Sequence, residues 1–226
     1  MNCCVVIPVG PGHEKLAEAA ENSARAAWDL RDKTAWNTMR VELYDDRYGH
    51  AGRSHARNTG ILLHRTADWY YLLDADDRAG PKTFSSFDPA TTLGAVYGWP
   101  SFHTQDGTIR RVKDGPRGWQ AVLDRGPLES LTMGCFFHGP SLREHLFRED
   151  LDHGEDWEMH LSFGAKYPLR VVQNTLCWVG IDQPSAGGPR GGERDWAKAS
   201  EPFFNYWRKR GRKPLTTEER AARYWQ

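Results

Sequence analysis

Hydrophobic residues in the first third of the chain form short unbroken runs separated by amphipathic stretches. Residues 3–9 are an apolar run rich in valine, which is typical of a strand buried on both faces of a parallel sheet. Between residues 14 and 30 the apolar positions recur at helical spacing among charges, which predicts an amphipathic helix. Two further strands are expected at 39–44 and 69–73, joined by a helix with Ser54 as its N-cap. This alternation predicts an α/β fold with a parallel sheet.

The later elements are less regular. We expect strands at residues 95–99, 133–138, 169–172 and 176–179, and helices at 81–87, 141–147, 195–210 and 217–225, with another beginning near 155. Thr216 and Glu219 have the spacing of a capping box at the start of the last helix. Residues 101–128 are rich in glycine, proline and charge, and are expected to form a hairpin and loops. The glycine-rich stretch 183–194 is predicted to be either an active-site lid or a connector.

Composition limits the class of protein. The chain has 226 residues, of which 30 are Lys or Arg and 30 are Asp or Glu, so a single globular domain can bury a core without disulfides or a structural metal. The net charge of zero gives no overall attraction to nucleic acid or membranes. No stretch approaches the roughly 18 consecutive apolar residues of a membrane span, and the first residues do not have the pattern of a cleaved leader. The four cysteines and nine histidines show no zinc-binding spacing. We therefore expect a cytoplasmic protein without a transmembrane segment.

Acidic residues follow two of the predicted strands directly. Two end the second strand and three follow the third: Asp45, Asp46, Asp74, Asp76 and Asp77. Ligands of parallel sheets bind at the carboxyl ends of the strands, where these carboxylates are expected to converge. Converging negative charges are costly without a cation, and hard oxygen ligands suit Mg²⁺ or Mn²⁺ bound to the phosphates of a substrate. The alternative is a solvated acidic turn, which is the interpretation favoured for the second Asp-x-Asp pattern, at residues 150–152.

Four segments carry a resemblance to a known family. They are VVIPV at residues 5–9, ARNTGI at 56–61, LDADD at 73–77 and GEDWE at 154–158. In this order and spacing they resemble the motifs of the family-2 glycosyltransferases, and together they cover roughly residues 3–165. The resemblance implies the GT-A fold, which has a single Rossmann-like, mostly parallel sheet flanked by helices, here with a helical C-terminal extension.

The resemblance also implies an inverting enzyme that moves a sugar from a nucleotide-diphosphate donor, with a UDP-sugar expected, to an acceptor hydroxyl. Asp76 would bind Mn²⁺ or Mg²⁺, Asp74 would reach the metal or the donor ribose, and Asp77 would support them. The cation would stabilise the charge that develops on the leaving diphosphate. Many relatives carry a late histidine ligand, for which Asp182 is the candidate here.

An inverting transfer also needs a base for the attacking hydroxyl. By resemblance, Asp156 is the candidate catalytic base, with Glu155 beside it. The alternative is that this acidic pair only favours the start of a helix through the helix dipole.

Residues expected to contact the nucleotide sugar lie on several loops. Pro8 and Gly10 resemble the first nucleotide-binding loop of the family. Asp45 and Asp46, which end the second strand, resemble the acidic residues that contact the base and ribose in that family. For Arg57, a buried pairing that holds the loop is the alternative. Arg190, with Arg194, would close over the diphosphate as part of a lid. The expected donor-binding residues are Pro8, Gly10, Asp45, Asp46, Arg53, Arg57, Asn58, Asp74 and Arg190.

The acceptor is less well defined. We expect a glycosyltransferase domain at residues 1–195, with the donor-binding half at 1–100 and the acceptor half, which carries the base, at 101–195, followed by a basic and aromatic extension at 196–226. The basic run at 206–213 fits a DNA backbone or an anionic membrane, or else it is a solvated face. The expected acceptors are therefore a glycan, a lipid-linked glycan or a hydroxylated DNA base. Tryptophans that would support a flipped base are Trp99, Trp119 and Trp157.

Two other functions compete with glycosyl transfer. A noncatalytic module of the same fold would bind DNA or glycan through the C-terminal extension. A metal-dependent phosphotransferase or nucleotidyltransferase would share the aspartate cluster, but it gives Asp156 no evident task.

Overall fold

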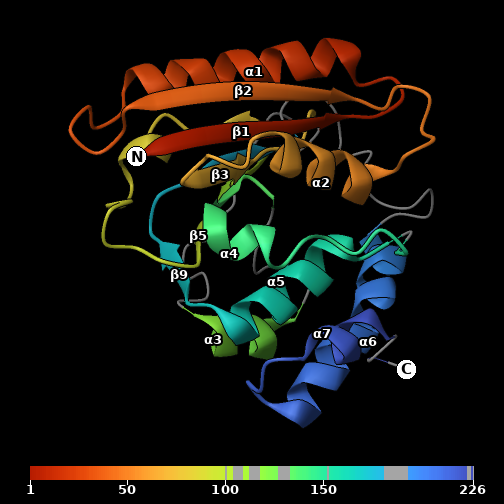
Figure 1. Cartoon of the computed structure of the whole chain (residues 1–226). Coiled ribbons are helices and arrows are strands. Elements are labelled where there is room, and N and C mark those ends of the chain that lie inside the picture. The colour runs from red at the N-terminus through yellow and green to blue at the C-terminus, as the bar shows by residue number, and fades with distance from the viewer. Residues whose placement is uncertain are drawn as a thin grey trace.

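The centre of the molecule is a six-stranded, mostly parallel sheet flanked by helices (Figure 1). The computed structural model describes residues 1–99, 101–103, 109–111, 118–126, 133–151, 153–180, 193–222 and 225. Only β8 is antiparallel to its neighbours in this sheet. The strand order is β2 (Thr38–Asp45), β1 (Asn2–Val9), β3 (Trp69–Leu72), β8 (Cys135–His138), β5 (Ala95–Gly98) and β9 (Leu169–Val172). The predicted α/β class is confirmed.

Helices cover both faces of β1. α1 (Glu14–Asp29) lies along one face (Figure 1), where its buried alanines share a core with Val5 and Ile7. α2 (Arg53–Leu63) lies on the other face and approaches β1 closely at Gly60. A Cβ at Gly60 would lie only 2.5 Å from Val6 Cγ1, so this position has no room for a side chain. The close approach holds α2 against this face of the sheet. Its first residue, Arg53, follows the loop after β2 and so lies near the carboxyl edge of the sheet.

A second, smaller sheet lies beside the first. Its strand order is β4 (Arg78–Ala79), β10 (Cys177–Val179), β6 (Ser101–His103) and β7 (Ile109–Arg111). The hairpin of β6 and β7 agrees with the expected hairpin in this region. The sequence pattern did not indicate β4 or its pairing with β10, because a strand of two residues has no periodicity and its partner is far away in sequence.

Two expected helices differ from the observed elements, and one helix forms where none was expected. The N-cap of α2 is Gly52, with a φ of 81°, and Ser54 lies buried inside the helix, so the predicted serine cap is wrong. The helix expected at 81–87 is only the 3₁₀ turn η1 (Thr83–Ser85), where serine hydroxyls bind the Lys82 carbonyl and compete with helical hydrogen bonds. Conversely, α3 (Trp119–Arg125) forms where loops were expected. It docks through its Trp119 indole, which donates to the Leu161 carbonyl at 2.9 Å.

Three of the remaining helices pack together at the end of the molecule opposite α1 (Figure 1): α5 (Glu155–Lys166), α6 (Glu193–Arg210) and α7 (Thr217–Ala221). The short helix α4 (Gly139–Arg143) directly follows β8 and lies nearer the middle of the molecule. Phe203, Phe204 and Trp207 of α6 are buried in the same core as much of α5. α7 begins with the predicted capping box, since Thr216 Oγ1 accepts from Glu219 N (3.1 Å) and Glu219 Oε2 accepts from Thr216 N (2.9 Å). Within the described parts of the chain, no helix has the length and apolar character needed to cross a membrane.

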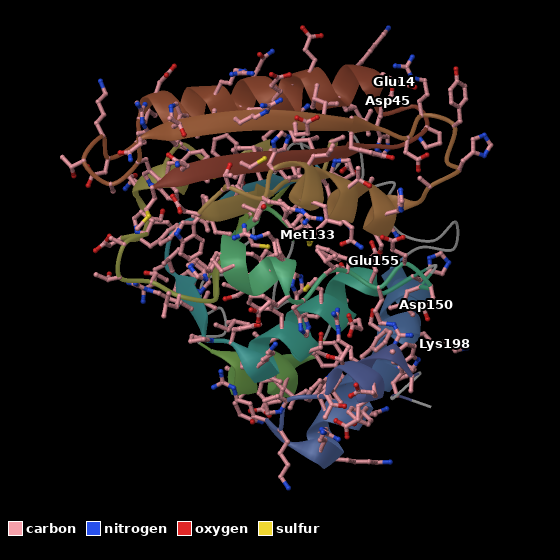
Figure 2. The ribbon with its side chains drawn as sticks, viewed as in Figure 1. Glu14, Asp45, Met133, Asp150, Glu155 and Lys198 are labelled. Carbon is pink, nitrogen blue, oxygen red and sulfur yellow. The ribbon has the colours of Figure 1, made fainter. Side chains whose placement is uncertain are left out.

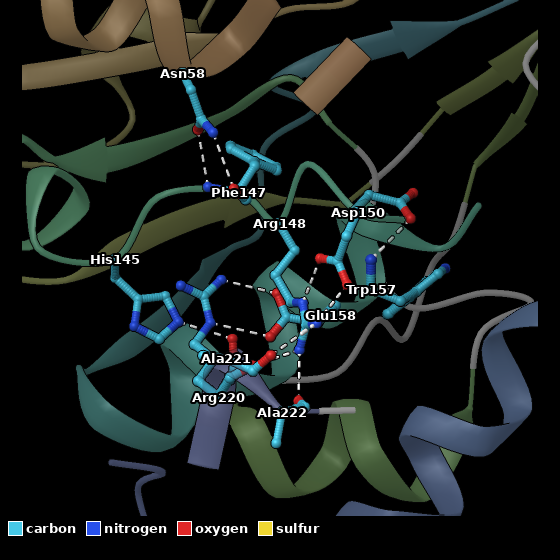
Figure 3. A network of polar contacts seen from close by, with 12 residues as sticks. Asn58, His145, Phe147, Arg148, Asp150, Trp157, Glu158, Arg220, Ala221 and Ala222 are labelled. Atoms are coloured by element: carbon cyan, nitrogen blue, oxygen red, sulfur yellow. Dashed lines mark hydrogen bonds and ion pairs between the residues drawn. The ribbon is translucent and has the colours of Figure 1, made fainter. Parts of the chain in front are cut away.

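Two arginines join the C-terminal segment to α5 and to the segment that precedes α5 (Figure 3). Arg220 of α7 donates to both carboxylate oxygens of Glu158, at 3.0 and 2.8 Å, and Glu158 is fully buried. Arg148 binds the backbone carbonyls of residues 220–222, pairs with Asp150, and lies 4.7 Å from the ring centre of Trp225. The C-terminal residues therefore stabilise the position of α5, the helix that starts at Glu155.

Candidate functional site

Three aspartates follow β3 directly, at the carboxyl edge of the sheet. Backbone hydrogen bonds from Leu73 N to Val6 O and from Asp77 N to Asp74 O, both 3.1 Å long, shape this turn. One carboxylate oxygen from each of Asp74, Asp76 and Asp77 lies within 4.8 Å of the others. Asp76 and Asp77 are buried, whereas Asp74 is partly exposed. The turn therefore gathers three carboxylates at a point that solvent can reach through Asp74.

Burial and repulsion disfavour negative charge in this cluster. The pKa of Asp76 is raised mainly by burial and then by the charge of Asp74, and the pKa of Asp77 is raised by burial and by both neighbours. A divalent cation would remove much of this penalty. Carboxylate oxygens are the hard ligands that Mg²⁺ and Mn²⁺ take, so the donor set fits such an ion.

Asp77 also has a structural task. Its carboxylate accepts hydrogen bonds from Gly180 N (3.2 Å) and from the Cys177 thiol (3.5 Å) at the end of β10. These contacts join the aspartate turn to the second sheet. Asp77 thus fixes the position of the turn that carries Asp74 and Asp76.

Arg57 connects the aspartate turn to α5. Its guanidinium donates to Asp74 Oδ1 at 2.6 Å and to Glu155 Oε1 at 3.2 Å, and the side chain is only 1% exposed. Burial by itself lowers the pKa of Arg57, but the charges of Asp74 and Glu155 outweigh it and raise that pKa above its usual value. The structure places Arg57 in the buried pairing that was one of its two expected roles. Arg57 and Glu155 are 98 positions apart in sequence.

The first turn of α5 carries the two predicted catalytic carboxylates. Gly154 is the N-cap, with a φ of 75° that suits glycine, and a Cβ there would lie 2.9 Å from Phe203. Glu155 is buried and lies next to α2 (Figure 2). Burial, followed by the charge of Glu155, raises the pKa of Asp156 to about 7, although Asp156 accepts a 2.8 Å hydrogen bond from Trp157 N. A carboxylate with this pKa can accept a proton near neutral pH.

Arg53 lies one turn before Arg57 on α2 and also contacts Glu155. Its Nε is 3.3 Å from Glu155 Oε1, and its side chain is 44% exposed. The charge of Arg53 acts to lower the pKa of both Asp76 and Asp156, against the larger effect of burial. Arg53 is therefore a solvent-accessible cation within the electrostatic range of both carboxylate groups.

The acidic pair after β2 shapes the loop that leads into α2. Asp45 lies near the end of α1 that carries Glu14 (Figure 2) and accepts from Arg47 Nε at 2.8 Å, which lowers the pKa of Asp45. Asp46 accepts from the N–H groups of Ala51 (3.1 Å) and Gly52 (2.8 Å). Both carboxylates thus have partners in their own loop. Their expected contact with a nucleotide stays a prediction.

Three other donor candidates lie on β1 and α2. Pro8 and Gly10 are at the carboxyl end of β1, where the Gly10 carbonyl accepts from His13 N at 3.1 Å. Asn58 binds elsewhere: it donates to Phe147 O (2.9 Å) and Glu149 Oε1 (2.8 Å) and accepts from Phe147 N (2.9 Å). The Asn58 amide therefore joins α2 to residues 147–149, which precede α5.

Some predicted residues lie outside the described part of the chain. These are Asp182, Arg190 and Asp152, together with the side chain of Arg194. Asp150 pairs with Arg148, as expected for a residue outside the metal site.

The C-terminal basic run is largely occupied by contacts within the protein. Arg208 pairs with Glu201, Arg210 pairs with Glu219, and Arg212 donates to the Gly164 and Tyr167 carbonyls. Arg208, Lys209, Arg212 and Lys213 are nevertheless exposed, so the solvated face and the binding surface for DNA or membrane both stay predictions. Two of the tryptophans expected to support a flipped base, Trp119 and Trp157, are buried in the core and have no exposed ring face to offer; that expectation is wrong for both.

The sequence pattern missed a buried pair next to the site. His160, one turn after Asp156 on α5, lies 2.8 Å through Nδ1 from the Tyr97 hydroxyl, and burial followed by the charge of Arg57 lowers its pKa to about 3. His160 is therefore neutral at physiological pH. The sequence signal that could have found His160 is its separation of four residues from Asp156, which places both side chains on the same face of a helix.

No protein-family model and no curated protein matches this chain. Among solved structures, A197 from STIV is similar at 13% identity and a TM-score of 0.44, over 78% of this chain and 83% of that one. GalNAc-T7, solved with UDP, GalNAc and Mn²⁺, is similar at 12% identity and a TM-score of 0.45, over 92% of this chain but only 48% of that one. A glycosyltransferase involved in the glycosylation of the major capsid of PBCV-1 is similar at 14% identity and a TM-score of 0.39, over 88% of this chain and 98% of that one. Two of these three proteins are glycosyltransferases, but at TM-scores below 0.5 neither a family nor a function follows from the likeness.

Proposed function

We propose that this protein is an inverting glycosyltransferase that moves a sugar from a nucleotide-diphosphate donor, with a UDP-sugar as the first candidate, to an acceptor hydroxyl. One observation carries the proposal. An aspartate whose pKa is raised to about 7 lies at the start of α5, and its neighbour Glu155 is joined through buried Arg57 to a cluster of three aspartates at the carboxyl edge of the sheet. One group suits proton transfer and the other suits a cation with a diphosphate.

On the donor side, Asp74 and Asp76 would hold Mn²⁺ or Mg²⁺. When bound, the cation supplies positive charge next to the phosphate oxygens of the leaving nucleoside diphosphate. Arg57 keeps Asp74 in place, and Asp77 keeps the whole turn in place through Gly180. In this assignment residues 1–100 bind the donor.

On the acceptor side, Asp156 would accept the proton of the hydroxyl that attacks the sugar. A direct displacement with inversion requires this base and the leaving diphosphate on opposite sides of the sugar, and α5 and the β3 turn supply two separate carboxylate groups. The candidate acceptors are a glycan, a lipid-linked glycan and a hydroxylated DNA base.

The first test is thermal stabilisation by a panel of nucleoside diphosphates and nucleotide sugars, with and without Mn²⁺, followed by release of nucleoside diphosphate. We expect Asp76→Asn to lose the Mn²⁺-dependent stabilisation. Asp156→Asn should keep it and lose turnover by about 10²- to 10⁴-fold, the usual contribution of a general base. Asp29→Asn, at an exposed position at the end of α1, is the matched control and should behave as wild type.

Full turnover in Asp156→Asn would contradict the proposal. Release of inorganic pyrophosphate in place of nucleoside diphosphate would also contradict it, because that product is typical of nucleotidyl transfer.

A further inference from the structure

One carboxylate oxygen holds two arginines of very different exposure. Glu155 Oε1 lies 3.2 Å from Arg57 Nη1 and 3.3 Å from Arg53 Nε. The two arginines are four residues apart on α2, so both side chains lie on the same face of that helix. Arg57 is 1% exposed and Arg53 is 44% exposed. Of the two guanidinium groups, a dissolved ligand can reach that of Arg53.

Arg53 also acts on both carboxylate groups of the candidate site. Its positive charge acts to lower the pKa of Asp76 in the aspartate turn and that of Asp156 on α5. An anion bound in this region would therefore be attracted to Arg53, whereas Arg57 is shielded and already divided between Asp74 and Glu155.

We propose that Arg53 changes partner when the donor binds: it leaves Glu155 and binds the diphosphate, while Arg57 stays on Asp74. This inference rests on the proposed function, from which the class of the anion, a sugar-linked nucleoside diphosphate, is taken. Glu155 is then a positioning residue. It holds Arg53 at the opening of the site in the free protein and touches no substrate.

The exchange is physically reasonable because its cost is low and its gain is larger. An ion pair at a half-exposed arginine is weak, since water competes for both groups. A phosphate offers the planar guanidinium two parallel charge-assisted hydrogen bonds, which are shorter and stronger. When Arg53 leaves, the buried carboxylate of Glu155 keeps Arg57 as its partner and is not left as an unpaired charge.

Calorimetric titration of the full chain with inorganic pyrophosphate and Mg²⁺ tests the exchange without knowledge of the nucleotide base. Arg53→Gln should weaken binding about 10- to 100-fold, the effect of losing a hydrogen bond to a charged group, and Arg53→Lys should weaken it less. Arg25→Gln is the matched control, because Arg25 is a similarly exposed arginine (54%) paired with Glu21 on the surface of α1. It should bind as wild type.

Glu155→Gln should have the opposite effect. Loss of the competing charge releases Arg53, so pyrophosphate should bind more tightly, and this gain should vanish in the double variant Arg53→Gln/Glu155→Gln. Wild-type affinity in Arg53→Gln, or an equal gain from Glu155→Gln in both backgrounds, would overturn the exchange. Asp76→Asn reports separately on the proposed metal site, because it should abolish the Mg²⁺ dependence of binding whatever Arg53 does.

Discussion

Arg220→Met is a stringent test of how the C-terminal segment supports α5. The substitution removes the cation that makes two hydrogen bonds to Glu158, at 3.0 and 2.8 Å, but keeps most of the apolar volume of the side chain. Glu158 is 0% exposed and the Arg220 side chain is 14% exposed, so the pair is almost completely removed from water. In Arg220→Met the carboxylate of Glu158 would stay buried without its charged partner.

Loss of one partner of a buried ion pair costs about 3–5 kcal/mol, which is a large share of the roughly 5–15 kcal/mol of a typical domain. For a chain of this size each kcal/mol lowers Tm by about 2–4 °C, so the expected decrease in Tm is roughly 6–20 °C. The assay is thermal and urea unfolding of the wild type, Arg220→Met, Glu158→Gln and the double variant. The double variant should recover most of the loss, since it leaves no charge in the interior.

Two outcomes would refute this reasoning. A loss below about 1 kcal/mol in Arg220→Met would give the pair only the value of a surface ion pair. Additive effects of the two substitutions would mean that Glu158 does not depend on Arg220 for its stability in the interior.

The other predictions concern pH and packing. The raised pKa of Asp156, about 7, means that its proton is bound more tightly in the folded state, so its contribution to stability should fall as pH rises from about 4 to 7. His145 and His160, with pKa values lowered to about 2 and about 3, make stability rise with pH instead. The contribution of Asp156 is therefore measured as the pH profile of the free energy of unfolding of the wild type minus that of Asp156→Asn. A difference that does not change with pH would contradict the raised pKa of Asp156. Gly60→Ala should cost about 1–3 kcal/mol in urea unfolding because its Cβ would meet Val6 at 2.5 Å, and Val6→Ala should reduce that cost; equal stability of Gly60→Ala and wild type would rule out the close contact.

The first half of the fold could be predicted because each element shows its own signal. β1 is an unbroken apolar run, α1 has buried alanines at helical spacing, and the turn after β3 begins where the apolar run ends. The second sheet could not be predicted, because β4 has two residues and is defined by its partner β10. The N-cap of α2 was missed because α2 starts at Arg53, which leaves Ser54 inside the helix, and the loop bound by Asp46 that sets this start has no periodic pattern.

For the candidate site, the sequence indicated chemical groups but not their connections. The convergence of Asp74, Asp76 and Asp77 could be predicted because all three lie in the one turn that follows β3. Asp45 and Asp46, which were expected at the same edge, bind partners in their own loop. The bridge of Arg57 between Asp74 and Glu155 depends on how α2 packs against α5, which no local pattern contains. For the same reason the sequence did not show that three arginines of the basic run have partners within the protein.

The ion pair between α5 and α7 has a consequence for synthesis of the chain. Glu158 and Arg220 are 62 residues apart, and a protein is made from its N-terminus, so Glu158 leaves the ribosome well before its partner. During that interval the helix that carries Asp156 lacks the two hydrogen bonds from Arg220 to Glu158, on a face that is buried in the folded protein. The strands of the central sheet precede α7 in the chain, so they can form before α7 is made, whereas we expect α5 to reach its final stability only after α7 has been synthesised. Formation of the site is thereby tied to synthesis of α7.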